Sequence, residues 1–178
     1  MFGYDRYPEQ LFKALSELKK EDEQFGNDLE IKLAGFVDVS IFKGLEEFGL
    51  KENLVHLGAI ERNKALQYTL NAQLLLLLIN KADNAKGRIP GKLFELMRAK
   101  RPILGLGVLG GDVHKIIQKS ATGEYYDYED YKSIKSFLKE KYSLFEKGEN
   151  KIDSKDIEEY SVENQTRKIG EYLDEIIK

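Results

Sequence analysis

Cysteine and tryptophan are absent from this 178-residue sequence, and histidine and proline are scarce. Without cysteine the chain has no disulfides, thiolate metal ligands or thiol nucleophiles, and nothing calls for an oxidising compartment, so we expect a cytoplasmic location. The two histidines, His56 and His114, are too few for a histidine-rich metal cluster. Asp83, Asp112 and Asp127 are not spaced as metal ligands either. We therefore assign no metal and no cofactor.

The sequence also lacks an excess of one charge and any long hydrophobic run. Its 28 Lys and Arg against 31 Asp and Glu give a net charge of -3, which disfavours binding to nucleic acid. The longest apolar run, residues 74–79, is too short to span a bilayer, and residues 1–8 do not resemble a signal peptide. Hydrophobic residues at 42% and charged residues at 33% are typical of one soluble globular domain.

Strand and helix patterns alternate along the chain. Period-two and uninterrupted apolar segments predict strands at residues 29–34, 54–57, 73–79, 102–106 and 124–126. Apolar residues at helical spacing predict helices at residues 8–25, 40–48, 61–71, 91–100, 112–119, 128–145 and 161–177. This alternation favours an α/β fold with a Rossmann-like, doubly wound parallel sheet as a single domain over residues 1–178.

Two features of this pattern stay open. The run at residues 73–79 suits a strand covered on both faces, and a buried helix segment is the alternative. The chain also begins directly with a helix where an α/β unit would supply a strand, so we expect the natural protein to begin further upstream. We expect residues 157–178 to form a terminal helix that packs on an N-terminal domain of the natural protein, which this sequence does not contain.

Ligands of open α/β sheets bind beyond the carboxyl ends of the strands, so the loops that follow strands are the candidate sites. After the strand at residues 73–79 come Arg88, Gly91, Lys92 and Glu95. Gly91 permits close approach of a ligand, the two cations and the start of a helix favour a phosphate, and Glu95 could accept hydrogen bonds from ribose hydroxyls. On residue chemistry alone, a solvated Lys92–Glu95 ion pair is the simpler interpretation.

A second candidate loop, residues 107–112, contains Gly110 and Gly111 before a helix. It could cradle a phosphate or a sugar, or be a tight connection that needs glycine only for its backbone angles. Neither the GxGxxG fingerprint nor the Walker lysine motif is present. We expect His56 to be a core residue and His114 to point to solvent, and we expect packing roles for Tyr125, Tyr126, Tyr128 and Tyr131.

Residues 87–106, GRIPGKLFELMRAKRPILGL, closely resemble the donor-site segment of family 4 glycosyltransferases of the GT-B fold. That segment has a glycine or serine, a lysine, a Phe-Glu-Tyr-like triplet, a small residue and a Lys-Pro-Ile-Leu strand. The matching residues here are Gly91, Lys92, Phe94, Glu95, Ala99, Arg101, Pro102, Ile103 and Leu104. Residues 29–35 and 54–60 resemble the two preceding strands of the family, and Arg6-Tyr7-Pro8 resembles the Arg-x-Pro stretch that opens its first C-terminal helix.

The resemblance implies the C-terminal, donor-binding half of a two-domain enzyme, with an N-terminal acceptor-binding half as its partner. It implies that Glu95 holds the ribose and that Ile60 touches the base. Lys92, Arg6 and the amides of Gly110 and Gly111 would neutralise the diphosphate without a metal. Catalytic residues stay unassigned and are expected partly on the other half, so the chain alone should be inactive.

The expected function is a bacterial hexosyltransferase that uses a UDP- or GDP-linked sugar to build a cell-surface polysaccharide or glycolipid. Peripheral association of the full-length enzyme with a membrane is compatible with such an acceptor. Many family members carry a second glutamate eight residues before the ribose-binding one, where this chain has Gly87. This departure allows a non-catalytic nucleotide-binding module as an alternative, and a nucleotide-sugar epimerase, which shares the fold, is another.

Overall fold

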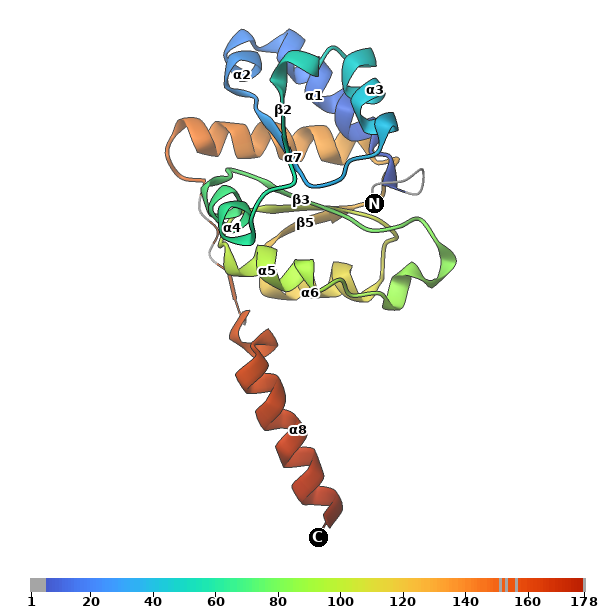
Figure 1. Ribbon diagram of the computed structural model, residues 1–178, viewed down its shortest axis with the longest axis vertical. Coiled ribbons are helices and arrows are strands. Elements are labelled where there is room, and N and C mark those ends of the chain that lie inside the picture. The colour runs from blue at the N-terminus through green and yellow to red at the C-terminus, as the bar shows by residue number, and fades with distance from the viewer. Residues whose placement is uncertain (1–5, 151, 153, 156, 178) are drawn as a thin grey trace.

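The computed structural model describes residues 6–150, 152, 154, 155 and 157–177, which form an α/β arrangement (Figure 1). The strands are β1 (Ile31–Ala34), β2 (Leu54–Gly58), β3 (Leu75–Leu78), β4 (Ile103–Leu106) and β5 (Gly123–Tyr126). The α-helices are α1 (Glu9–Glu21), α2 (Glu23–Asp28), α3 (Val39–Glu47), α4 (Arg62–Asn71), α5 (Lys92–Arg98), α6 (Asp112–Ser120), α7 (Tyr131–Glu146) and α8 (Val162–Ile177). Short 3₁₀ helices are η2 (Lys51–Asn53), η3 (Asp83–Gly87) and η4 (Ile157–Tyr160).

All pairings between the described strands are parallel, as the sequence predicts, but the strands form two sheets rather than one. β1 pairs with β2 in the first sheet, and the second sheet has the order β3-β4-β5. In the second sheet Leu75 lies beside Ile103, and Ile103 lies beside Gly123. The carboxyl ends of β3, β4 and β5 therefore meet at one edge.

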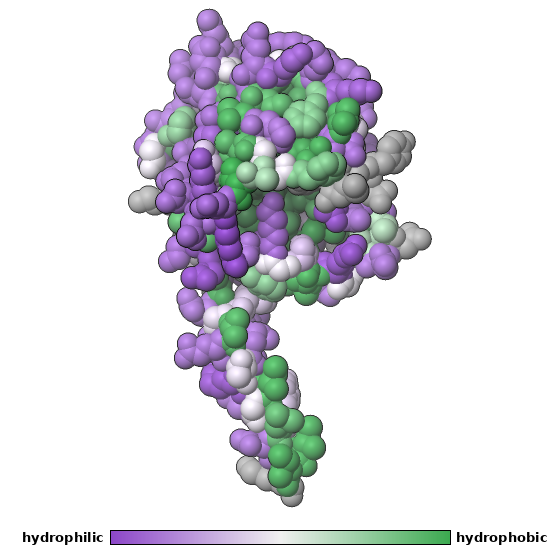
Figure 2. Space-filling view, in the orientation of Figure 1, coloured by the Kyte–Doolittle hydropathy of each residue, from purple (hydrophilic) through white to green (hydrophobic). Residues whose placement is uncertain are grey.

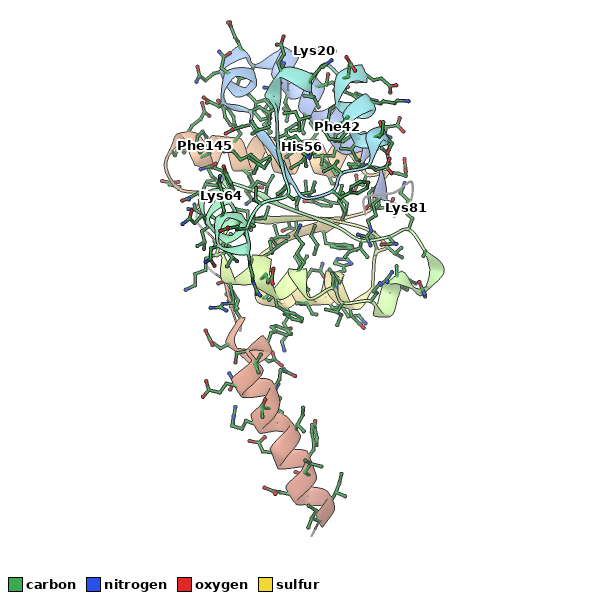
Figure 3. The ribbon with its side chains drawn as sticks, in the orientation of Figure 1. Lys20, Phe42, His56, Lys64, Lys81 and Phe145 are labelled. Atoms are coloured by element: carbon green, nitrogen blue, oxygen red, sulfur yellow. The ribbon has the colours of Figure 1, made fainter. Side chains whose placement is uncertain are left out.

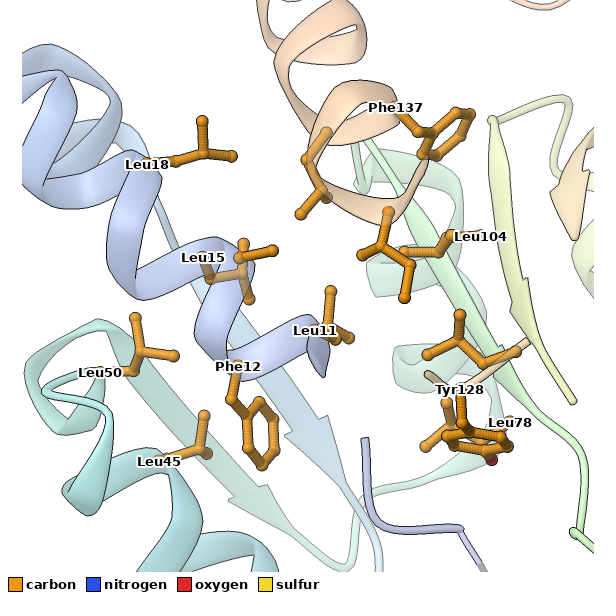
Figure 4. Packing of buried hydrophobic residues seen from close by; sticks show 14 of the residues in the cluster. Leu11, Phe12, Leu15, Leu18, Leu45, Leu50, Leu78, Leu104, Tyr128 and Phe137 are labelled. Carbon is orange, nitrogen blue, oxygen red and sulfur yellow. The ribbon is translucent and has the colours of Figure 1, made fainter. Parts of the chain in front are cut away.

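The position of β3 explains the uninterrupted apolar run, because its side chains alternate between two hydrophobic clusters, one on each face of the sheet. Leu75, Leu77 and Ile79 pack in a cluster with α5 and α6, whereas Leu76 and Leu78 belong to a cluster with α1, α3 and α7. Figure 4 shows part of the second cluster, with Leu78 beside Tyr128. The sequence prediction of a strand covered on both faces is confirmed, and the buried-helix alternative is excluded.

The prediction of a single helix over residues 8–25 is wrong, because the chain breaks at Asp22. The extended backbone of Asp22 ends α1, and its carboxylate accepts hydrogen bonds from the amides of Gln24 at 2.9 Å and Phe25 at 3.1 Å. An Asp side chain in this position competes with the helical hydrogen bonds and starts a new helix. Helix α2 then extends past Gly26 to Asp28, beyond the predicted end.

The terminal helix α8 projects away from the rest of the protein (Figure 1). Its apolar side chains lie along one side and are exposed (Figure 2), and they are Val162, Ile169, Tyr172, Leu173, Ile176 and Ile177. Nothing in the described part of the chain covers this face. Within the same residues, no helix combines the length and the apolar character that crossing a membrane requires.

Candidate functional site

The carboxyl edge of the second sheet is held by buried hydrogen bonds. The Ile79 amide donates to the Leu106 carbonyl at 2.8 Å, which extends the β3–β4 ladder by one residue. The hydroxyl of buried Tyr128 donates to the Ile79 carbonyl at 3.0 Å, so the chain after β5 is tied to the chain after β3. Tyr128 thus packs as the sequence predicts, and it fixes the start of the loop that carries Asn80.

Arg6 lies at this edge although it is remote in sequence from β3. Its Nε donates a short hydrogen bond to the side-chain oxygen of Asn80. Burial lowers the pKa of Lys92, and the nearby guanidinium of Arg6 lowers it further. Burial raises the pKa of Tyr128 well above its usual value, and Arg6 offsets a small part of that rise. The structure therefore brings together Arg6 and Lys92, two of the residues that the resemblance assigns to a diphosphate.

The surroundings of Lys92 disfavour the charged form of its ammonium group and so lower its pKa. Desolvation by the surrounding protein is the largest cause that lowers its pKa, Glu95 partly restores it, and Arg6 lowers it further. The side chain is nevertheless open to solvent. Among the described residues Lys92 makes no hydrogen bond or salt bridge that would compensate.

Glu95 forms a long ion pair with Arg62 of α4, with 3.5 Å between Nη2 and Oε1. Both side chains are exposed, so this pair contributes little to stability. The structure thus differs from the simple Lys92–Glu95 pair considered from the sequence. Sequence reasoning missed Arg62, although its place after the loop that follows β2 puts it at a carboxyl strand end.

The start of α5 offers fewer free amides than the sequence suggests. The amides of Leu93 and Phe94 donate to the carbonyls of Pro90 at 2.9 Å and Gly91 at 3.2 Å. These tight turns leave the amides of Gly91 and Lys92 for a ligand. Gly91 itself has ordinary helical angles, φ -55° and ψ -27°, and a Cβ there would meet no protein atom within 4 Å. The fold alone therefore gives no reason for glycine at this position.

The glycine loop after β4 is fixed by internal contacts. The Gly110 amide donates to Nδ1 of His114 at 2.9 Å, and the His114 ring stacks on Tyr125 with 5.2 Å between ring centroids. The prediction that His114 points freely to solvent is therefore wrong. Gly111 is buried where a Cβ would lie 2.9 Å from the Lys86 carbonyl oxygen. The Gly110 amide is thus already engaged. Gly110 has a positive φ of 75° and Gly111 has no room for a Cβ, so both glycines have a structural reason for their identity.

The two remaining candidates, Arg88 and Ile60, have no hydrogen bond or ion pair to Arg6 or Lys92 among the described residues. Arg88 is exposed on the loop before α5, and Ile60 is half-buried after β2, in the first sheet. His56, expected in the core, is instead exposed on β2, with its Nε2 3.3 Å from the Gly35 carbonyl oxygen. Its ring packs edge-on against Phe42 at 5.1 Å, and Figure 3 shows the two side by side.

Lys81 is a third cation near this edge, which the sequence analysis did not single out. Its ammonium lies 4.7 Å from the centre of the Tyr128 ring and 3.0 Å from a carboxylate oxygen of Glu129. These contacts hold Lys81 in place, so it is less available to a ligand than Lys92. In the part of the chain that the structure describes, no three His, Asp or Glu side chains converge as metal ligands.

Parallel strands with helices on both faces and polar groups at their carboxyl ends define a Rossmann-like α/β domain. No family model matches the sequence, and no curated protein matches it. Among solved structures, the chain is similar to WaaG, a glycosyltransferase involved in lipopolysaccharide biosynthesis, with a TM-score of 0.61 and 17% sequence identity. The match covers 80% of this chain and 35% of that one, so the chain spans well under half of WaaG. This likeness confirms the predicted fold class, one Rossmann-like half of a GT-B architecture.

Proposed function

We propose that this chain is the nucleotide-sugar-binding half of a glycosyltransferase and that Arg6 and Lys92 bind the diphosphate of the donor. The observation that carries the proposal is the closeness of these two cations at the carboxyl edge of β3. Like charges that oppose each other in a partly desolvated place are unfavourable until an anion binds between them. A diphosphate removes that repulsion, and in the transfer reaction it would stabilise the charge that develops on the leaving nucleoside diphosphate.

Glu95 is the acceptor that we assign to the ribose hydroxyls. It lies one helical turn from Lys92, close enough to influence the pKa of that residue. Its long, exposed pair with Arg62 is weak enough for ribose to replace it. Ile60 after β2 is the residue that we assign to the base, and the donor would be a UDP- or GDP-linked hexose.

The acceptor would be a polysaccharide or glycolipid of the cell surface, bound by a second domain that faces the carboxyl edge of the strands. Support comes from the match to WaaG, whose chain is much longer than the matched part. Residues of that second domain would complete the catalytic site, so this chain alone would bind the donor without transferring its sugar. We assign the exposed apolar face of α8 to the same domain.

Charge-removing variants test the proposal. Replacing Arg6 or Lys92 with Ala removes a charge-assisted contact and should weaken binding of UDP or GDP about tenfold or more, measured by calorimetry. Lys20→Ala is the matched control, because Lys20 is an exposed lysine of α1 remote from this edge (Figure 3), and its affinity should match that of the unmodified chain. Equal affinity in all three variants would exclude Arg6 and Lys92 from the site.

A further inference from the structure

The side chain of Tyr125 on β5 lies across β4, on the face of the sheet that α5 and α6 cover (Figure 1). In the pairing of β4 with β5, Tyr125 stands beside Gly105. A Cβ on Gly105 would collide with the Tyr125 ring, and a Cβ on Gly107 would collide with its hydroxyl. The two glycines therefore provide the space for the ring, and the hydroxyl extends past the last residue of β4 to the carboxyl edge.

The hydroxyl of Tyr125 has no hydrogen-bond partner among the described residues, although the residue is only 5% exposed. The described side-chain atoms that are both fully enclosed and unpartnered are Ser40 Oγ and Asn150 Oδ1. Because the Tyr125 oxygen is not one of them, it reaches a surface that solvent can enter. Buried tyrosines usually pair their hydroxyl, as Tyr128 does with the Ile79 carbonyl. Tyr125 thus has a hydrogen-bond donor available for a ligand.

This free hydroxyl lies at the same edge as the two cations of the candidate site. The point that a Cβ on Gly107 would occupy is also 2.9 Å from Ile79 Cβ, so the hydroxyl lies between the ends of β4 and β3. Ile79 directly precedes the asparagine that binds Arg6. Burial is the main cause that raises the pKa of Tyr128, Tyr125 adds to the rise, and Arg6 offsets part of it. Electrostatic effects of this kind act over short distances, so the three side chains lie in one region.

The neighbouring glycine loop explains why a side-chain donor is needed here. The Gly110 amide donates to Nδ1 of His114, and the His114 ring stacks on Tyr125 with an angle of 14° between the ring planes. The hydrogen bond occupies an amide that the family resemblance assigns to the diphosphate. The stacking holds the phenol ring in place. The loop therefore offers one backbone donor fewer, and it positions the hydroxyl of Tyr125 instead.

We propose that the Tyr125 hydroxyl donates a hydrogen bond to a phosphate oxygen of the nucleoside diphosphate. This assignment rests on the proposed function and adds a neutral donor to the charges of Arg6 and Lys92. Burial, with a smaller effect of Asp127, raises the pKa of Tyr125 to about 12, so the hydroxyl keeps its proton at neutral pH. A donor that the fold already holds in position stabilises charge on a leaving diphosphate without rearrangement.

The substitution Tyr125→Phe tests the proposal, because it removes one oxygen and keeps the ring that fills the space over the glycines. Since the hydroxyl has no partner in the described part of the chain, the variant should unfold at the same denaturant concentration as the unmodified chain. Its affinity for UDP or GDP, measured by calorimetry, should fall about fivefold to tenfold, the loss expected for one hydrogen bond to a charged group. A lower denaturation midpoint would overturn the proposal, because the hydroxyl would then have a structural role.

Tyr126→Phe is the matched control. Tyr126 is the next residue of β5, and its ring packs on the other face of the sheet, 6.1 Å from the Phe137 ring. Removing its hydroxyl should leave nucleotide affinity unchanged, and equal losses in the two variants would overturn the proposal. If the unmodified chain binds a diphosphate and Tyr125→Phe binds it equally well, the assignment of Tyr125 fails while the proposed function stands. If the unmodified chain binds neither UDP nor GDP, both fail.

Discussion

At the scale of single residues, the account depends on the charge of Lys92. Desolvation and the nearby Arg6 both hold the pKa of Lys92 below its usual value. The side chain therefore loses its proton at a lower pH than an ordinary lysine. Bound diphosphate would favour the charged form and raise the pKa again, so binding and protonation of Lys92 are linked.

This linkage predicts a pH dependence. The affinity of the chain for UDP or GDP should fall as the pH rises toward the usual pKa of lysine, about 10.4, and the fall should begin at a lower pH than for an ordinary lysine. Lys92→Arg should bind with an affinity that changes much less over the same range, because a guanidinium stays protonated. Calorimetry at a series of pH values measures both. Parallel decreases in the two proteins would mean that another group causes the effect.

A substitution at Gly91 should change nucleotide affinity without lowering the stability of the fold. Since a Cβ at this position meets no protein atom and the backbone is helical, Gly91→Ala should leave the free energy of unfolding unchanged or raise it by about 0.5–1 kcal/mol. Its nucleotide affinity should fall, because the methyl group occupies the approach to the site. Gly170→Ala in exposed α8 is the matched control, with a similar gain in stability and normal affinity. Normal affinity in Gly91→Ala would remove this glycine from the site.

Local spacing drew attention to Gly91, Lys92 and Glu95, and the resemblance to a known family then assigned them to a ligand site, which stays a prediction. Local spacing could not show that Arg62 pairs with Glu95, or that His114 occupies the Gly110 amide. The first contact joins two helices, and the second depends on how the His114 ring stacks on a tyrosine. Such pairings arise from tertiary packing, and residue spacing along the sequence does not predict them.

At the scale of elements, Asp22 decides where one helix ends and the next begins. Asp22→Ala removes the acceptor for two amides of α2 and should lower the free energy of unfolding by about 1 kcal/mol. Asp22→Asn keeps an oxygen in the same position and should cost much less. Chemical denaturation compares the two variants. Equal stability of both would show that the capping bonds do not hold α2.

Helix α8 provides a second prediction at this scale. Leu173 is 52% exposed, so Leu173→Ser should change the free energy of unfolding of this chain by less than about 0.5 kcal/mol. Leu93 of α5 is fully buried, and Leu93→Ala should cost about 2–5 kcal/mol. Thermal denaturation of both variants measures the difference. A large loss of stability in Leu173→Ser would mean that α8 packs on its own chain.

The elements were predictable to different degrees. The apolar run around β3 identified a strand because only a surface covered on both faces tolerates such a sequence. The sequence analysis did not predict the break between α1 and α2, because the apolar spacing continues across Asp22 to buried Phe25. The division of the strands into two sheets was not predicted either, since strand order depends on contacts between segments that are distant in the sequence.

At the scale of the whole molecule, one layer of α1, α2, α3, β1 and β2 lies above a second layer built on β3, β4 and β5 (Figure 1). Helix α7 packs against α1, and the tie between Arg6 and Asn80 brings the entry to α1 to the carboxyl edge of β3. The candidate site thus draws residues from both layers, with Arg6 at the entry to α1 and Lys92 on α5. A ligand that contacts both layers should stabilise the whole fold.

Calorimetric titration of the unmodified 178-residue chain with UDP, GDP and the corresponding monophosphates tests the central claim most directly. The account predicts that one diphosphate binds, and that it binds at least about tenfold more tightly than its monophosphate, because only the diphosphate reaches both Arg6 and Lys92. No heat of binding from either diphosphate at millimolar concentration, or equal affinity for mono- and diphosphate, would contradict it.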